Sequence, residues 1–327
     1  MESKPNLRKT YAVVLAALYG IVTLCIISEH HTLVSISYVF ILPLLIGTIP
    51  VLFSTREQML SFKSLILIPW GSIFLFVLLA FALKLEGIIC LVIIVAPFIL
   101  LGTLAAFVVQ LVRQHYKGPK TPLYSSLLLP LIIMVAEQNM TPADAFHTVT
   151  TTLEVNAPQA TVWQHVKHVK DVRPEEIQTH FTHLIHVPKP LHGYLDKEGA
   201  DATRSISWDK GIQFRFDIQE WHEGEGFTYR VNLDGHSIPP NTLDEHVMVG
   251  GAFFDVVSGS YRIKALSPAK SLLTLTSTYR VTTTFNFYCI WWADFLMDDL
   301  HEMILEIIKT RSEKAPHLSS RRLCAAG

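Results

Sequence analysis

One arginine and one glutamate lie where a predicted strand could bring a charge into an apolar interior. Arg204 precedes Ile206 and Trp208 by two and four residues, so the three side chains share one face of a strand. A buried guanidinium can bind a carboxylate or phosphate through two parallel hydrogen bonds. Glu220 has the parity of the apolar residue Phe214. If both charges are buried, they are candidates for holding a ligand headgroup or for acid–base chemistry; at the rim of a sheet they are ordinary solvated charges.

Aromatic and aliphatic side chains alternate with polar ones along the neighbouring segments, which predicts an apolar wall on one face of a sheet. Buried tyrosine hydroxyls need hydrogen-bond partners and could orient a ligand. The alternative is that these side chains pack against one another as an ordinary core. The candidate ligand-binding residues are Arg204, Trp208, Phe214, Phe216, Tyr229, Tyr261, Tyr279, Trp292, Leu296 and Leu300.

Other chemistry is weakly indicated. Histidines recur at three-residue spacing at His165 and His168 and at His180, His183 and His186, but without carboxylate or cysteine ligands at a defined spacing. We therefore predict no metal site and no cofactor. A nucleophile elbow, a phosphate-binding glycine loop and a close pair of inward acids are all missing from the sequence, which argues against an enzyme.

The elements that must position these residues end in one long amphipathic helix, predicted over Phe287 to Lys309. Its inward face is expected to carry no central ionisable residue, because the acids fall opposite. Before it we predict a strand and a short helix, and then strands that alternate with period two. The ranges are 148–155 for the first strand, 159–168 for the helix, and 202–208, 211–221, 226–233, 246–257, 260–266 and 272–285 for the later strands.

The first half of the chain is strongly apolar. Four uncharged segments are long enough to cross a bilayer as helices, at Thr10 to Ser28, Ile36 to Phe53, Ser64 to Leu83 and Gly87 to Val112. Lysines and arginines gather on one side of them, which predicts a multi-pass protein of the cytoplasmic (inner) membrane with both ends in the cytoplasm. The apolar segment 123–136 is short for a span; if it crossed, the C-terminal domain would change sides.

A net charge of −1 without a basic surface argues against nucleic-acid binding.

The motifs of the second half resemble a known superfamily. The stretch LEVNAPQATVWQHV resembles the first strand and helix of START-like (SRPBCC) proteins. Further stretches, GADATRSISWDKGIQFRFDIQEW and TYRVTTTFNFYCIWWADFLMDDLHEMILEIIKTRSE, resemble bacterial membrane proteins of the polyketide cyclase/dehydrase and lipid-transport type. The resemblance covers about residues 148–313 and implies a helix-grip fold, in which an antiparallel sheet wraps around the C-terminal helix and leaves an apolar cavity. Such folds serve carriers, receptors and cyclases alike, so the fold does not choose among functions.

We therefore predict a four-helix transmembrane region (1–115), a linker with a short interfacial segment (116–146), an α+β helix-grip domain (147–314) and a disordered tail (315–327). The predicted function is membrane-anchored binding of a lipid or another hydrophobic small molecule. One alternative is a polyketide cyclase or dehydratase acting on a hydrophobic substrate. Another is an interaction or assembly module that uses a side stripe of Tyr288, Trp291 and Phe295.

Overall fold

The computed structural model describes residues 5–29, 35–55, 61–115, 126–234, 237–240 and 242–314. The chain divides into two compact units. Unit 1 comprises Met1–Asp144 with the segments Asp244–Val247 and Thr282–Asn286; unit 2 comprises the remainder. The tail predicted to be disordered, 315–327, lies outside the described residues, as do 116–125 of the predicted linker.

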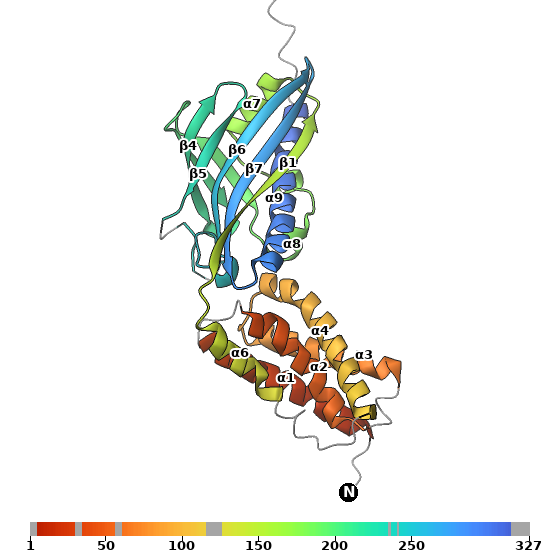
Figure 1. Ribbon diagram of the computed structural model, residues 1–327. Coiled ribbons are helices and arrows are strands. Elements are labelled where there is room, and N and C mark those ends of the chain that lie inside the picture. The colour runs from red at the N-terminus through yellow and green to blue at the C-terminus, as the bar shows by residue number, and fades with distance from the viewer. Residues whose placement is uncertain are drawn as a thin grey trace, which may run out of the picture. The chain divides into compact units, whose positions relative to one another are not determined.

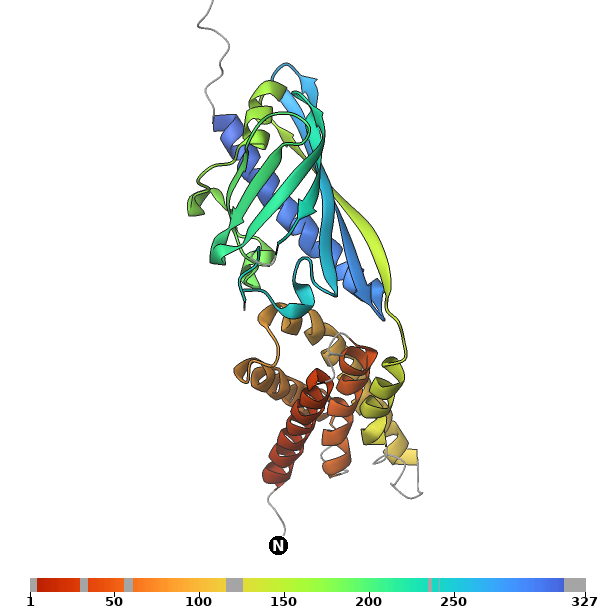
Figure 2. The same cartoon turned by 90° about the vertical axis from the view of Figure 1, so that its left-hand side faces the viewer.

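Unit 1 is helical, because long stretches of its sequence are apolar on every side (Figure 2). Glu137 closes the bundle: its carboxylate accepts hydrogen bonds from the backbone N–H groups of Ile36 and Ser37 at 2.6 and 3.0 Å and from the Ser37 hydroxyl at 2.6 Å. The elements are α1 (Pro5–Glu29), η1 (Ser37–Ile41), α2 (Leu42–Phe53), α3 (Phe62–Ala82), α4 (Ile88–His115), η3 (Ser126–Leu128) and α6 (Leu129–Glu137).

Three helices of the described residues are long and apolar enough to cross a membrane, over Leu7–Ser28, Phe62–Ala82 and Ile88–His115. The prediction of four spans was therefore wrong by one. The segment predicted as Ile36 to Phe53 forms a shorter apolar helix, Ser37–Phe53, whose first turn is π-helical. At about 1.5 Å per residue such a helix reaches about 25 Å, which is less than the roughly 30 Å of a bilayer's hydrocarbon core.

Unit 2 is built on a curled antiparallel sheet in the order β1-β7-β6-β5-β4-β3-β2 (Figure 1). The first strand therefore lies beside the last one, and the other neighbours follow in sequence. The strands are β1 (Ala143–Val155), β2 (Pro190–Leu195), β3 (Thr203–Trp208), β4 (Gln213–His222), β5 (Gly226–Asn232), β6 (Phe254–Ser267) and β7 (Lys270–Thr283).

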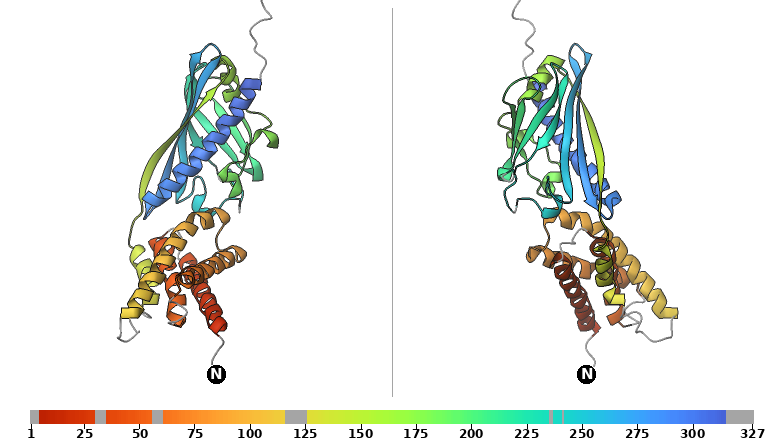
Figure 3. Two further views of the ribbon diagram at one scale, coloured as in Figure 1. Left: turned by 90° about the vertical axis from the view of Figure 1, so that its right-hand side faces the viewer. Right: turned by 60° about the vertical axis from the view of Figure 1, so that its left-hand side comes forward.

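The long helix α9 (Asn286–Lys314) runs diagonally along one face of this sheet (Figure 3). The short helices α7 (Gln159–Lys167) and α8 (Phe181–Leu184) pack beside it, and the start of α8 is held by the Asp299 carboxylate, which accepts bonds from the Thr182 N–H and hydroxyl at 2.9 and 2.7 Å. Apolar residues of the sheet, α7 and α9 form one core. This is the predicted helix-grip arrangement.

The sheet in the structure differs from the predicted one in two details. The strands predicted at 246–257 and 260–266 are a single strand, Phe254–Ser267, and 245–247 form the short helix η6 (Glu245–Val247). Strand β2 was not predicted, because its sequence PLHGYL contains a proline and a glycine and no β-branched residue.

A β-bulge in β4 explains a third difference. The pairing between β4 and β5 shifts between Ile218 and Glu220, so Trp221 takes the inward position that simple alternation gave to Glu220. Trp221 packs on the core, whereas Glu220 is exposed. Glu220 is therefore no candidate for an interior acid.

Candidate functional site

Arg204 lies in the interior of unit 2 with only 2% of its surface exposed. Its guanidinium carbon is 5.1 Å from the ring centre of Tyr261 and 5.6 Å from that of Phe227. These are cation–π contacts, which favour a guanidinium but do not neutralise its charge. Within the described chain, the Arg204 Nε and Nη1 atoms have no hydrogen-bond partner, and no carboxylate forms an ion pair with this side chain.

The contact between Arg204 and Tyr261 depends on the curl of the sheet. Arg204 in β3 and Tyr261 in β6 are three strands apart, a distance of about 14 Å in a flat sheet at about 4.8 Å per strand. Their side chains nevertheless meet, because curling brings the inward faces of the outer strands together. The guanidinium therefore lies over the concave face of the sheet and not at its rim.

Two glycines leave room for the polar groups of this face. A Cβ atom on Gly193 would lie 3.1 Å from Arg204 Nη2, and one on Gly259 would lie 2.4 Å from the Tyr229 hydroxyl oxygen. Gly259 is the direct neighbour of Tyr229 across β5 and β6. Any larger residue at Gly259 would displace that hydroxyl.

Tyr229 and Tyr261 are the two tyrosines that accompany Arg204, at 4% and 3% exposure. The Tyr229 ring stacks on Phe216 with a centroid distance of 4.2 Å, and it lies 6.1 Å from the Tyr261 ring. Burial raises the pKa of both phenols, and the neighbouring Arg204 charge acts in the opposite direction. Both are neutral hydrogen-bonding groups at neutral pH.

His301, which sequence reasoning missed, brings an ionisable group to the inward face of α9. It is 2% exposed; its Nε2 lies 2.8 Å from the Ser277 hydroxyl and its Nδ1 lies 3.1 Å from the Thr151 hydroxyl. Thr151 in turn donates to the Asp298 carboxylate at 2.5 Å. Burial lowers the pKa of His301 to about 4, although the Asp298 charge opposes this shift. The expectation that this face carries no ionisable residue was therefore wrong.

A sequence signal for His301 did exist. It follows Met297 by four residues and precedes Leu305 by four, so all three lie on one stripe of the helix. Both of those neighbours are buried. The apolar stripe assigned from the sequence was centred on Leu296 and Leu300, and it is rotated from the one that faces the sheet.

The structure does not bring all predicted site residues together. Tyr279 is fully buried, but it lies in a separate cluster with Val149, Val281 and Met297, and its hydroxyl donates to Asp294 at 2.6 Å. Trp208 is half-buried, with its ring edge-to-face against Phe214 at 6.5 Å. The Trp208 Nε1–H has no acceptor in the described chain.

Of the predicted residues of α9, Trp292 is half-buried and its ring is 6.4 Å from that of Phe181 in α8. Leu296 and Leu300 are also half-buried, and Leu300 packs against the core. Of the side stripe, Trp291 and Phe295 are exposed and Tyr288 is half-buried with its ring 6.4 Å from Trp291.

No family model matches the chain, and no curated protein matches it either. Unit 2 has a helix-grip architecture, in which a curled antiparallel sheet is closed by the C-terminal helix. The chain is similar to the Zhui aromatase/cyclase from Streptomyces sp. R1128, at 12% identity and a TM-score of 0.34 over 54% of this chain and 99% of that one. It is also similar to a START superfamily protein from Mycobacterium smegmatis (14%, TM-score 0.33, 51% and 97%) and to norcoclaurine synthase from Thalictrum flavum (11%, 0.32, 53% and 90%).

Proposed function

We propose that this chain is a membrane-anchored START-like protein that binds an amphipathic molecule, with its apolar body among the aromatic residues of unit 2 and an acidic headgroup on Arg204. The observation that carries the proposal is the buried, unpaired guanidinium. An isolated buried charge costs several kcal/mol, even after relaxation. A bound carboxylate or phosphate would offset that cost with charge-assisted hydrogen bonds to Nε and Nη1.

Two other cations of unit 2, the buried Lys167 and the half-buried Arg311, support this interpretation. Lys167 forms an ion pair with Glu198, and Arg311 binds Glu176 through two nitrogens at 2.8 and 2.7 Å. The chain therefore supplies carboxylates where a cation only has to be accommodated. Arg204 lacks one on a face lined by tyrosine and phenylalanine, which is the lining expected for an apolar ligand.

The apolar helices of unit 1 supply the proposed anchor. A tethered binding domain meets membrane-derived molecules at a high effective concentration. We retain the proposal that both ends of the chain are cytoplasmic and that the regions are 1–115, 116–146, 147–314 and 315–327. Protease access to the C-terminal domain in inverted membrane vesicles tests the side of the membrane, and protection in such vesicles would contradict it.

The central experiment is to purify the full chain in mild detergent and to identify bound molecules by native mass spectrometry. We expect a stoichiometric amphipathic acid that is lost from Arg204→Met. The control is Arg215→Met, because Arg215 is exposed and pairs with Asp234 on the surface. A ligand that is retained equally in both variants, or an acid and its methyl ester that bind equally well, would contradict the role of Arg204.

The cyclase or dehydratase alternative has one observation in its favour, which is His301. A buried neutral imidazole hydrogen-bonded to Ser277, close to the Tyr229 hydroxyl, is the kind of acid–base group that such a reaction needs. His301→Gln separates the two functions. An enzyme would keep ligand binding and lose turnover, whereas a binding protein would show no turnover in either form.

A further inference from the structure

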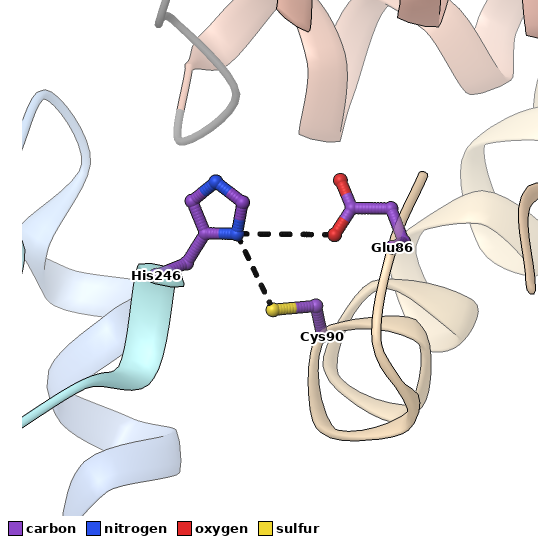
Figure 4. A group of neighbouring side chains, drawn as sticks. All are labelled: Glu86, Cys90 and His246. Carbon is purple, nitrogen blue, oxygen red and sulfur yellow. Dashed lines mark hydrogen bonds and ion pairs between the residues drawn. The ribbon is translucent and has the colours of Figure 1, made fainter. Parts of the chain in front are cut away.

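Unit 1 contains a second buried group of chemically active side chains, built from two segments far apart in the sequence. Glu86 lies in the turn before α4 and Cys90 lies in the first turn of α4, while His246 lies in η6. The His246 Nδ1 atom is 3.7 Å from Cys90 Sγ and 3.9 Å from Glu86 Oε2 (Figure 4). One ligand atom from each residue lies within 4.8 Å of the other two.

The Glu86 carboxylate is the informative member, because it is buried without its full set of partners. It is 6% exposed, and its Oε1 atom has no hydrogen-bond partner in the described chain. Glu137, in the same unit and 7% exposed, accepts three hydrogen bonds. Buried carboxylates are ordinarily satisfied as Glu137 is. A buried carboxylate with one unpartnered oxygen, whose other oxygen faces an imidazole and a thiol, points to a missing cation.

Asp244 lies next to Cys90 and is a candidate for a fourth metal ligand. The Cys90 backbone N–H lies 3.5 Å from Asp244 Oδ2, and a Cβ atom on Gly87 would lie 1.5 Å from Asp244 Oδ1. The carboxylate therefore packs directly against the start of α4, where only glycine leaves space for it. Within the described chain, no lysine or arginine forms an ion pair with Glu86 or Asp244.

The spacing of these atoms fits a small tetrahedral ion. Zinc bonds of about 2.3 Å to sulfur and about 2.0 Å to nitrogen or oxygen separate sulfur from nitrogen by about 3.5 Å, and nitrogen from oxygen by about 3.3 Å. The observed 3.7 and 3.9 Å exceed these values by less than 1 Å, within the reach of side-chain adjustment. A thiolate, an imidazole and carboxylates favour zinc over magnesium or calcium, which prefer oxygen ligands alone.

We propose that Glu86, Cys90 and His246 bind a zinc ion, with Asp244 as the fourth ligand. On binding, the Cys90 thiol forms a bond from sulfur to zinc and releases its proton to solvent. With four protein ligands the site is closed, as structural zinc sites are, and it would fix the segment 244–247 against the first turn of α4.

The histidine runs singled out in the sequence do not contribute to this site. No pattern in the sequence indicated the proposed zinc site, because Cys90 and His246 are 156 residues apart. Glu86 and Cys90 are one helical turn apart, but in the sequence they look like part of an ordinary loop and part of an apolar helix.

The test is zinc titration of the untagged full chain in detergent after removal of metal by a chelator, with a chromophoric chelator as competitor. We expect one zinc per chain, and a loss of affinity of about 100-fold or more in Cys90→Ser and in His246→Gln. The matched controls are Cys25→Ser and His115→Gln, both exposed in unit 1, which are expected to bind as the unmodified chain does.

Cobalt(II) gives a second readout that does not depend on the variants' stability. Bound to the unmodified chain, cobalt should show a thiolate-to-metal charge-transfer band that disappears in Cys90→Ser and survives in Cys25→Ser. No zinc above background, zinc held equally by all variants, or a cobalt spectrum without thiolate character would each overturn the proposal. The site shares no residue with Arg204, so its failure leaves the proposed ligand binding intact.

Discussion

Unit 1 and unit 2 each bury one ionisable side chain that lacks a full set of protein partners, an acid in unit 1 and a base in unit 2. In unit 2 it is the guanidinium of Arg204, at 2% exposure; in unit 1 it is the carboxylate of Glu86, at 6%. Each has a satisfied counterpart in its own unit, Arg311 on Glu176 and Glu137 on the start of η1. Arg311 and Glu137 thus have protein partners, whereas Arg204 and Glu86 keep atoms without them, and our two proposals give each a ligand of opposite sign.

The side chains around Arg204 and those around Glu86 suit different kinds of ligand. Arg204 lies among aromatic rings contributed by several strands of one sheet, which suits a large apolar molecule with one acidic group. Glu86 lies among a thiol, an imidazole and a second carboxylate, which suits a small ion. In both proposals, the sign of the unpaired group sets the charge of the ligand, and the neighbouring side chains set its size.

The largest expected effect comes from comparing Arg204→Met with Arg311→Met. Removing the unpaired Arg204 charge should leave the free energy of unfolding of the ligand-free protein unchanged or raise it by about 1–4 kcal/mol, while binding of the acidic ligand falls about 100-fold or more. Removing the paired Arg311 should lower stability by about 1–3 kcal/mol, because Glu176 is then left unpaired. Urea unfolding and equilibrium binding measure the two quantities. Equal destabilisation by both substitutions would assign Arg204 a purely structural role.

The next largest effect is the pH dependence of stability caused by His301, which is buried but has hydrogen-bond partners. Its folded pKa of about 4 lies below the ordinary value of about 6.5, so the unfolded state takes up the proton first. The stabilising contribution is complete above pH 6.5 and is lost as the pH falls toward 4, by about 3 kcal/mol in total. Urea unfolding between pH 7 and pH 4 should show this slope, and His301→Gln should flatten it. An unchanged slope in the variant would place the titration elsewhere.

A smaller effect is expected from comparing Glu86→Gln with Glu137→Gln in the protein without metal. Glu137→Gln should lower the free energy of unfolding by about 1–3 kcal/mol, since it replaces an acceptor of three hydrogen bonds by a neutral amide. Glu86→Gln removes a carboxylate with an unpartnered oxygen and should leave the free energy of unfolding unchanged. Thermal unfolding in detergent measures both. If Glu86→Gln is the more damaging of the two, Glu86 is held by the protein alone.

The smallest effect should come from Glu220→Ala, which tests the bulge in β4. Because the bulge turns Glu220 to solvent, we expect a change in stability within about 0.5 kcal/mol and no change in ligand binding. A large loss of binding would place Glu220 on the inward face after all.

Period-two alternation and the amphipathic final helix were enough to predict a run of strands followed by a long helix that closes the sheet, although β2 was missed and β6 was divided in two. The parity of Arg204 allowed either the inward face or the rim of the sheet. The structure has it on the inward face, and its strand has no bulge. Glu220 had the same two alternatives, and it is exposed because one extra residue in β4 reverses the parity. The patterns failed at His301, whose burial depends on how α9 is rotated. The grouping of Glu86, Cys90 and His246 could not be predicted, since it depends on a tertiary contact between segments with no shared pattern.

The pairing of β1 with β7 has a consequence for how the protein is made. Strand β1 ends at Val155 and β7 begins at Lys270, so about 115 residues must be synthesised before the two can meet. At about 5–20 residues per second, β1 waits roughly 6–23 seconds on the ribosome without its partner. Its outward threonines, such as Thr148 and Thr150, which later bond to Thr278 and Thr276, keep this waiting strand polar on one side and so limit its tendency to pair with other chains.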